Sequence, residues 1–297
     1  MPDLADLYPG FTSEWISTRG GRIFARVGGK GPPLLLLHGY PQTHVMWHLV
    51  APVLAEKFTV VVPDLRGYGD SSKPSGGEMT YAKRTMARDN VQVMRSLGFE
   101  KWCVAGHDRG ARVSYRMAFD HPERVEKLCI LDVVPTIEQY EAAGKNRKVA
   151  VGMYHWFFLA SPAPLPEKLI GSDPEYYLRH SMETWAGQNA RFDPAAMAEY
   201  IRCFSDPETI RATCDCYRAG PTVDCDIDEA NRKAGDKIGC PTLILWGDRD
   251  GKWDEDRMVG TWKRWASDVR GQAVPGSHFC PEEAPEETAK AIGDFFS

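Results

Sequence analysis

An aspartate occupies the centre of Gly106-His107-Asp108-Arg109-Gly110, a spacing in which many enzymes carry a nucleophilic serine. A serine alkoxide attacks a carbonyl carbon, whereas a carboxylate acts best by displacement at a saturated carbon that bears a leaving group. Organic halides and epoxides are therefore better candidate substrates than peptides. Taken alone, these five residues would more often be a simple turn that contains an aspartate, so the rest of the chain decides.

The sequence around Asp108 fits a strand, a sharp turn and a helix. Residues 102–105 form a short apolar run that favours a strand, and residues 111–120 carry a helical apolar pattern. The glycines at both ends of the motif let the backbone fold tightly. In such a turn the central side chain stands at the carboxyl edge of the sheet, so we predict that Asp108 is a nucleophile.

A histidine is expected to activate the water that releases an ester of Asp108, because an imidazole titrates near neutral pH. Of the eight histidines, His278 is the best candidate. It lies in the turn-forming sequence Pro275-Gly276-Ser277-His278-Phe279, after the last strand. It also follows the nucleophile and the acid in chain order, as the base does in hydrolases with this type of turn. We therefore predict that His278 is the general base.

Three acids could orient His278. Asp132 ends the apolar run of residues 128–131, and Asp248 and Asp250 follow the later run of residues 242–246. Both runs are expected to be strands whose following loops open at the carboxyl edge of the sheet. Spacing alone does not choose among the three.

Two arginines, Arg109 and Arg112, fall in the first turn of the helix that follows Asp108. They are three residues apart and therefore share a face of that helix. The helix dipole disfavours cations at this end by several tenths of a kcal/mol, so each arginine needs a structural acid, solvent or a bound anion. Guanidinium groups suit the last of these, since they bind a carboxylate through paired hydrogen bonds.

The apolar pattern predicts an α/β fold. Residues 14–18 and 22–27 flank Arg19-Gly20-Gly21 as a hairpin. Continuous apolar runs typical of buried parallel strands alternate with helical stretches. The runs cover residues 34–37, 60–62, 102–105, 128–131 and 242–246, and the helical stretches include residues 81–97, 110–120 and 288–296.

Between residues 136 and 230 the strand pattern disappears. Proline, tryptophan and tyrosine become frequent there, and helical stretches such as residues 174–185 and 194–204 dominate. We therefore expect a core domain made of residues 1–135 and 231–297, and a helical cap domain made of residues 136–230.

Composition excludes several classes of protein. The chain has 297 residues and a formal net charge of −5, which argues against nucleic-acid binding. The first residues are acidic and lack an apolar signal segment, and the longest aliphatic run, residues 34–37, is too short to cross a membrane. We expect a cytoplasmic protein with no membrane partner. The cysteines Cys214, Cys216 and Cys225 lack the paired spacing of a metal site, so no metal or cofactor is expected.

Five motifs carry a resemblance to a known family. They are His38-Gly39-Tyr40-Pro41-Gln42-Thr43, Asp64-Leu65-Arg66-Gly67-Tyr68-Gly69, residues 106–112, Leu131-Asp132-Val133-Val134-Pro135-Thr136 and Tyr154-His155-Trp156. The chain resembles the haloacetate dehalogenases of the α/β-hydrolase superfamily, and is closest in pattern to the fluoroacetate dehalogenases. The first two motifs are shared with epoxide hydrolases and haloalkane dehalogenases, whereas the last three are specific.

The resemblance implies an α/β-hydrolase fold, with a mostly parallel sheet flanked by helices and an inserted helical cap. It implies hydrolysis of haloacetate to glycolate and halide through an aspartyl ester, without a cofactor, by a homodimer. It selects Asp132 as the orienting acid. It also implies that Arg109 and Arg112 bind the substrate carboxylate.

Further roles follow from the same resemblance. His155, Trp156 and Tyr217 match the halide pocket of the family, and each can donate a hydrogen bond to the departing halide. The backbone N–H groups of Tyr40 and Arg109 would form the oxyanion hole during ester hydrolysis. Trp185 is expected to form part of the pocket wall.

Two other functions remain open from the sequence. An epoxide hydrolase would use the same Asp108 nucleophile, with cap tyrosines to protonate the epoxide oxygen. The paired arginines argue against it, because a neutral epoxide offers them nothing to bind. A ligand receptor of the same fold would keep the pocket with little turnover, and the intact set Asp108, Asp132 and His278 argues against that. The cap tyrosines that could protonate an epoxide oxygen are Tyr140, Tyr154, Tyr176, Tyr177, Tyr200 and Tyr217.

Overall fold

The computed structural model describes residues 6–188, 190–249, 251 and 253–297, and a sheet of eight strands lies at its centre. The strands are β1 (Thr12–Thr18), β2 (Gly21–Gly28), β3 (Pro33–Leu37), β4 (Thr59–Pro63), β5 (Trp102–His107), β6 (Val125–Leu131), β7 (Thr242–Gly247) and β8 (Val269–Val274). Their order across the sheet is β1-β2-β4-β3-β5-β6-β7-β8. The hairpin β1–β2 joins antiparallel to β4, and all pairs from β4 to β8 are parallel.

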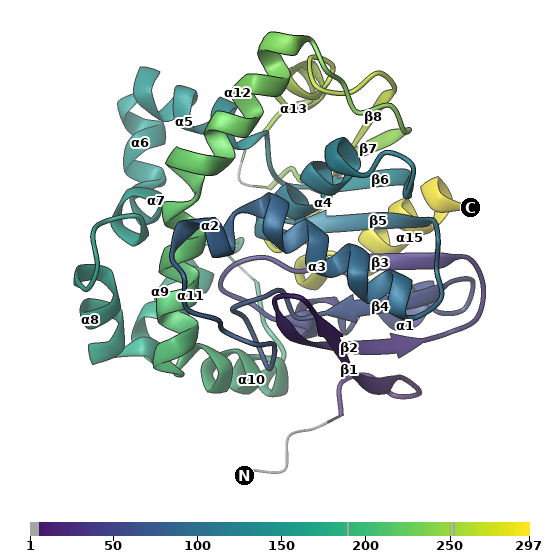
Figure 1. Cartoon of the computed structure of the whole chain (residues 1–297), viewed down its shortest axis with the longest axis horizontal. Helices are drawn as coiled ribbons and strands as arrows, with labels where there is room; N and C mark the ends of the chain where they lie inside the picture. Colours follow the sequence, from purple (N-terminus) through teal and green to yellow (C-terminus); the bar gives the residue numbers. More distant parts are fainter. Residues whose placement is uncertain (1–5, 189, 250, 252) are drawn as a thin grey trace.

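Helices cover both faces of the sheet. Figure 1 shows α3 (Lys83–Ser96) and α4 (Arg109–Asp120) in front of the sheet and α15 (Pro285–Phe296) behind it. This cover of helices on both faces explains the apolar composition of the central strands, because a strand covered on both faces has no polar side. Residues 34–37 and 60–62 are accordingly fully buried. Other helices before β6 or after β7 in the described ranges are η1 (His44–Trp47), α1 (Ala51–Leu54), α2 (Glu78–Tyr81), α13 (Glu255–Trp262) and α14 (Cys280–Glu283).

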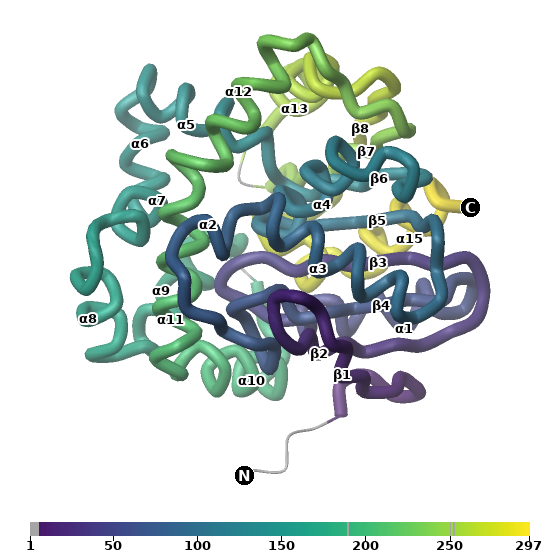
Figure 2. The backbone as a smooth tube through the Cα atoms, in the orientation of Figure 1, coloured from purple at the N-terminus to yellow at the C-terminus, as the bar shows by residue number. Residues whose placement is uncertain are grey.

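A helical insertion separates β6 from β7. Figure 2 shows this segment gathered to one side of the sheet as a continuous path of helices. Its members are α5 (Thr136–Lys145), α6 (Arg147–Gly152), α7 (Tyr154–Leu159), α8 (Leu165–Ser172), α9 (Pro174–Trp185), α10 (Pro194–Phe204), α11 (Pro207–Arg218), the π-helix η2 (Gly220–Asp224) and α12 (Cys225–Ala234).

Three helices of the insertion begin with the same local signal, an aspartate followed by proline. The carboxylates of Asp173, Asp193 and Asp206 accept hydrogen bonds from backbone N–H groups of the first turn, and the proline occupies a position that needs no donor. These residues fix where α9, α10 and α11 start. The helical stretches predicted at residues 174–185 and 194–204 therefore agree with the structure.

The predicted α/β-hydrolase architecture is confirmed, with three differences in detail. Strand β8 was not predicted, since its sequence VRGQAV has no apolar run. The helix expected over residues 81–97 is divided between α2 and α3, because Ala82 adopts an extended ψ of 141°. The last inserted helix continues to Ala234, past the expected boundary at residue 230. The division into core and cap domains stays a prediction. No helix in the described ranges is long and apolar enough to cross a membrane.

Candidate active site

Asp108 stands in a strained turn between β5 and α4. Its φ of 47° and ψ of −112° lie outside the regions that non-glycine residues usually adopt. The flanking glycines leave room for this turn: a Cβ on Gly106 would lie 2.4 Å from Ser114 Oγ, and one on Gly110 would lie 2.3 Å from Leu37 O. Such strain persists where the surrounding structure fixes it, often at functional sites. The turn predicted from the motif is therefore present, with Asp108 at its centre.

The Asp108 carboxylate is held in its ionised form. Burial alone would raise its pKa, but the positive charge of Arg109, followed by the nearby imidazoles of His278 and His107, holds the pKa well below the ordinary range. The backbone N–H of Tyr40 donates to Asp108 Oδ1 over 2.9 Å. Oδ1 is thus bound by a donor, whereas Oδ2 accepts no hydrogen bond from the described part of the chain.

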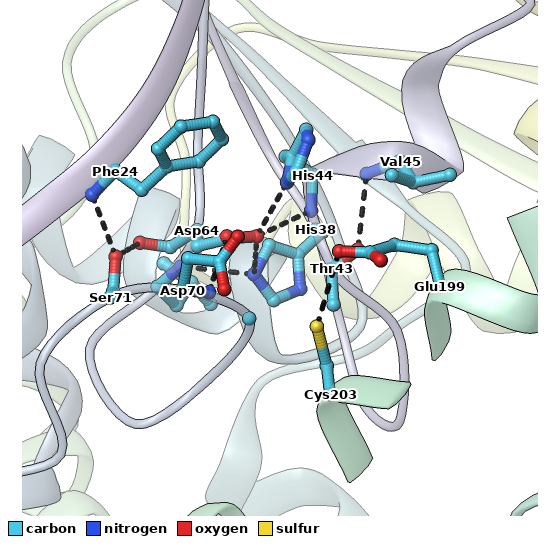
Figure 3. Close-up of polar contacts among 12 residues, drawn as sticks. Phe24, His38, Thr43, His44, Val45, Asp64, Asp70, Ser71, Glu199 and Cys203 are labelled. Carbon is cyan, nitrogen blue, oxygen red and sulfur yellow. Dashed lines mark hydrogen bonds and ion pairs between the residues drawn. The ribbon is translucent and has the colours of Figure 1, made fainter. Parts of the chain in front are cut away.

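The segment that carries Tyr40 is fixed by a buried polar network, drawn in Figure 3. Asp64 accepts from the backbone N–H of His44 at 2.8 Å and lies 2.9 Å from His44 Nδ1. Although burial opposes ionisation, the contacts with His44 lower the pKa of Asp64 to about 2. His38 Nε2 accepts from the N–H of Leu65 at 2.9 Å. These bonds join the first two sequence motifs and position the Tyr40 amide beside Asp108.

His278 pairs with Asp132. The distance from His278 Nδ1 to Asp132 Oδ2 is 2.7 Å, and Asp132 is only 3% exposed. Asp132 has a φ of 56°, which is uncommon for a residue with a side chain. Asp248 is exposed and has no side-chain hydrogen bond or ion pair among the residues that the structure describes. Asp250 lies outside the described residues. The geometry therefore agrees with Asp132 as the orienting acid.

One histidine of this site was not singled out from the sequence. His107 Nε2 lies 2.7 Å from the backbone oxygen of His278, and burial followed by the nearby His278 lowers the pKa of His107 to about 4. A neutral His107 can donate this hydrogen bond and so support the loop that carries His278. Its position next to Asp108 in the sequence was the available signal.

A cavity of about 1020 Å³ joins the carboxyl ends of β5 and β6 to the helical insertion. It brings together Asp108, Asp132, His278 and Arg112 with the four cap residues predicted from the resemblance. Of the remaining lining, only Val133 and Tyr154 belong to a motif quoted above. The described residues that line the cavity are Asp108, Arg112, Asp132, Val133, Gln139, Lys148, Val149, Val151, Gly152, Met153, Tyr154, His155, Trp156, Thr184, Trp185, Tyr217, Gly251, Trp253, Arg257 and His278.

The two arginines after Asp108 are buried without an acidic partner in the described part of the chain. Arg112 donates from Nη1 to Val134 O at 3.0 Å and to Thr136 Oγ1 at 3.1 Å, and it lines the cavity. Arg109 is fully buried, and its three guanidinium nitrogens have no hydrogen-bond partner among the described residues. Its side chain is not part of the cavity lining, so its predicted contact with a substrate carboxylate stays a prediction.

Aromatic rings take the place of acids around these guanidinium groups. Arg109 lies 3.5 Å from the ring centre of Tyr217 and 4.6 Å from that of Trp156, and Arg112 lies 4.6 Å from the Trp156 ring. Contacts of this kind stabilise a desolvated cation by about 2 kcal/mol. They leave its charge in place, so the site keeps an excess of positive charge near Asp108.

The residues predicted for the halide pocket form an aromatic cluster in the cavity. The Tyr217 ring centre lies 6.0 Å from those of His155 and Trp156. Trp185 packs 4.4 Å from the His155 ring and 6.1 Å from the His278 ring, which places it between these two histidines. The structure thus brings all four residues to the cavity beside Asp108.

No group of three or more His, Cys, Asp or Glu side chains in the described ranges could hold a metal ion.

The fold and this site are those of an alpha/beta hydrolase, and the chain belongs to that family, whose model matches residues 32–285. It is 40% identical to a fluoroacetate dehalogenase from Burkholderia sp, over 98% of this chain and 95% of that protein. It is 38% identical to a soluble epoxide hydrolase from Corynebacterium sp. (strain C12), over 94% of both proteins. A solved alpha/beta hydrolase structure from Nostoc sp PCC 7120 is 52% identical, with a TM-score of 0.92, and the match covers 97% of this chain and 98% of that one. The resemblance stated from the motifs is confirmed.

Proposed function

We propose that this protein hydrolyses haloacetate to glycolate and halide through an ester of Asp108. The observation that carries the proposal is the presence of Arg112 in one cavity with an ionised Asp108. Burial disfavours the charge of Arg112, and this side chain forms no ion pair with an acid among the described residues, so a substrate carboxylate would supply a counter-charge in direct contact. That contact would bring the halogen-bearing carbon beside the nucleophile. The 40% identity to a fluoroacetate dehalogenase supports this substrate class.

The first chemical step is a displacement. The free oxygen of Asp108 forms a bond to the halogen-bearing carbon as the carbon–halogen bond breaks, and the halide leaves with the electron pair. Charge that develops on the halide is met by the side chains proposed to donate to it, His155, Trp156 and Tyr217. Donors in a site with little water stabilise such charge more than water does.

The second step hydrolyses the ester. His278 takes a proton from water, and the resulting hydroxide attacks the carbonyl carbon of Asp108. The new charge falls on Oδ1, which already receives the N–H of Tyr40, and the N–H of Arg109 is proposed as the second donor. Asp132 stabilises the protonated imidazole through its contact with Nδ1. The bond between the Asp108 carbonyl carbon and the glycolate oxygen then breaks, that oxygen takes up the proton from His278, and Asp108 is regenerated as a carboxylate.

Epoxide hydrolysis is the second candidate function. It is supported by the 38% identity to a soluble epoxide hydrolase and by two tyrosines, Tyr154 and Tyr217, in the cavity lining. A panel of fluoro-, chloro- and bromoacetate together with styrene oxide separates the two functions. We expect halide and glycolate from at least one haloacetate. If styrene oxide yields diol and no haloacetate yields halide, epoxide hydrolysis replaces dehalogenation as the proposed function.

Arg112 is expected to make the enzyme require a carboxylate on its substrate. Charge-assisted hydrogen bonds contribute roughly 1.5 to 3 kcal/mol, so Arg112→Leu should lower kcat/KM for haloacetate by about 10- to 150-fold. Steady-state halide release measures this change, and Arg95→Leu on the exposed side of α3 is the matched control. The parent enzyme should turn over haloacetamide poorly. Equal turnover of haloacetate and haloacetamide would contradict the role of Arg112.

A further inference from the structure

A second carboxylate supports the loop of the base from outside the cavity. Glu283 ends α14 and is not part of the cavity lining. Its carboxylate accepts three backbone N–H groups: Oε1 accepts from Phe279 at 3.0 Å, and Oε2 accepts from Ser277 at 3.2 Å and from Gly187 at 3.0 Å. Two of these donors are the residues on either side of His278. A single side chain therefore holds the backbone of the base at both neighbours.

The third donor links this loop to the helical insertion. Gly187 follows Trp185, whose ring is a wall of the cavity beside His278. The approach is close, because a Cβ on Gly187 would lie 2.9 Å from both Glu283 Oε2 and Ser277 Oγ. Glu283 thus joins the segment after Trp185 to the loop that carries His278.

The other supports of His278 act at different atoms. Asp132 contacts the imidazole Nδ1, and His107 contacts the backbone oxygen of His278. Neither constrains the N–H groups of Ser277 and Phe279, on the two sides of His278, and among the described residues only the Glu283 carboxylate accepts from them. The neighbouring Glu282 is occupied elsewhere: it accepts from Gln42 and Tyr200, and burial raises its pKa to about 8.

We propose that Glu283 is a positioning residue for His278, and that it acts on ester hydrolysis without acting on the displacement. The inference rests on the proposed function. Displacement by an ionised Asp108 needs no base, whereas water activation needs His278 at a defined place. Misplacement of a catalytic group by about 1 Å can lower a rate on the order of 100-fold.

Glu283→Gln tests this role, because an amide offers one acceptor atom where the carboxylate offers two. The variant can serve either Phe279 or the pair Ser277 and Gly187, but not both. With chloroacetate we expect kcat to fall roughly 10- to 100-fold, and KM to fall with it, so that kcat/KM stays near the parent value. Rapid-quench kinetics should show one equivalent of chloride released quickly, and mass spectrometry should show the ester on Asp108.

The matched control is Glu287→Gln, an exposed position on α15 that should leave kcat and KM unchanged. If Glu283→Gln does not fold, Glu283→Asp keeps both carboxylate oxygens with a shorter reach and is measured in the same way. The inference is overturned if the folded variant matches the control, or if kcat/KM falls as far as kcat with no ester present. Failure of the proposed function is distinguishable, since His278→Asn would then also show neither chloride release nor ester.

Discussion

His278→Asn should stop turnover and leave the enzyme as a stable ester on Asp108. In the proposed displacement step the ionised Asp108 attacks and no proton is transferred, so this step proceeds without a base. Hydrolysis of the ester needs a proton acceptor for water, a contribution of up to about 10⁴-fold that the amide of asparagine does not supply. Asparagine can still donate to Asp132, so the pocket should keep its shape. We expect steady-state halide release to fall by about 10⁴-fold.

The adduct is the decisive measurement. After incubation with chloroacetate, intact-protein mass spectrometry should show one added carboxymethyl group, and peptide mapping should place it on Asp108. His180→Asn, at an exposed position of α9, is the control and should turn over normally without an adduct. Unmodified His278→Asn protein that still binds substrate would contradict the assignment of His278 to the hydrolytic step.

The sequence predicted those features of the site that depend on short segments. The turn at Asp108 could be read from two glycines and the flanking strand and helix, because its geometry is determined within a few residues. The positions of His155 and Trp156 came from the resemblance alone, since a His-Trp pair in a helix carries no local signal of a halide pocket. Lys148 and Trp253 also line the cavity, but they belong to no motif and were not predicted.

Helical periodicity predicted only part of the arrangement of the two arginines. Arg109 and Arg112 share a face of α4, as their spacing requires, yet only Arg112 lines the cavity. The difference arises from the helical insertion, which places Tyr217 against the Arg109 guanidinium. Because Tyr217 is more than a hundred residues away in the chain, periodicity within α4 could not anticipate this contact.

The contacts of the loop that carries His278 could also not be predicted from the sequence. Glu283 lies five residues after His278, a spacing that by itself would fit a solvent-exposed side chain. Its three bonds to backbone N–H groups depend on how α14 turns back toward the loop and on the approach of Gly187 from the insertion. Such contacts follow from tertiary packing, which no local pattern records.

The choice between Asp132 and Asp248 shows the same limit and gives the second large expected effect. Both aspartates follow neighbouring parallel strands, β6 and β7, so their sequence contexts are equivalent. The backbone at Asp132, with its φ of 56°, presents the carboxylate to His278, whereas Asp248 is exposed. Asp132→Asn should therefore lower ester hydrolysis by about 10²- to 10⁴-fold, because the imidazole remains but loses its orienting and stabilising charge.

Asp248→Asn serves as the matched control, and its hydrolysis rate should stay within about twofold of the parent, as for a surface residue away from the chemistry. The two rates are compared by single-turnover decay of the Asp108 ester formed from chloroacetate. Since neither substitution touches the nucleophile, the displacement rate should be similar in both variants. Slow ester decay in Asp248→Asn with normal decay in Asp132→Asn would transfer the orienting role to the later strand. That outcome would also require the loop of His278 to turn away from the contact with Asp132 during hydrolysis.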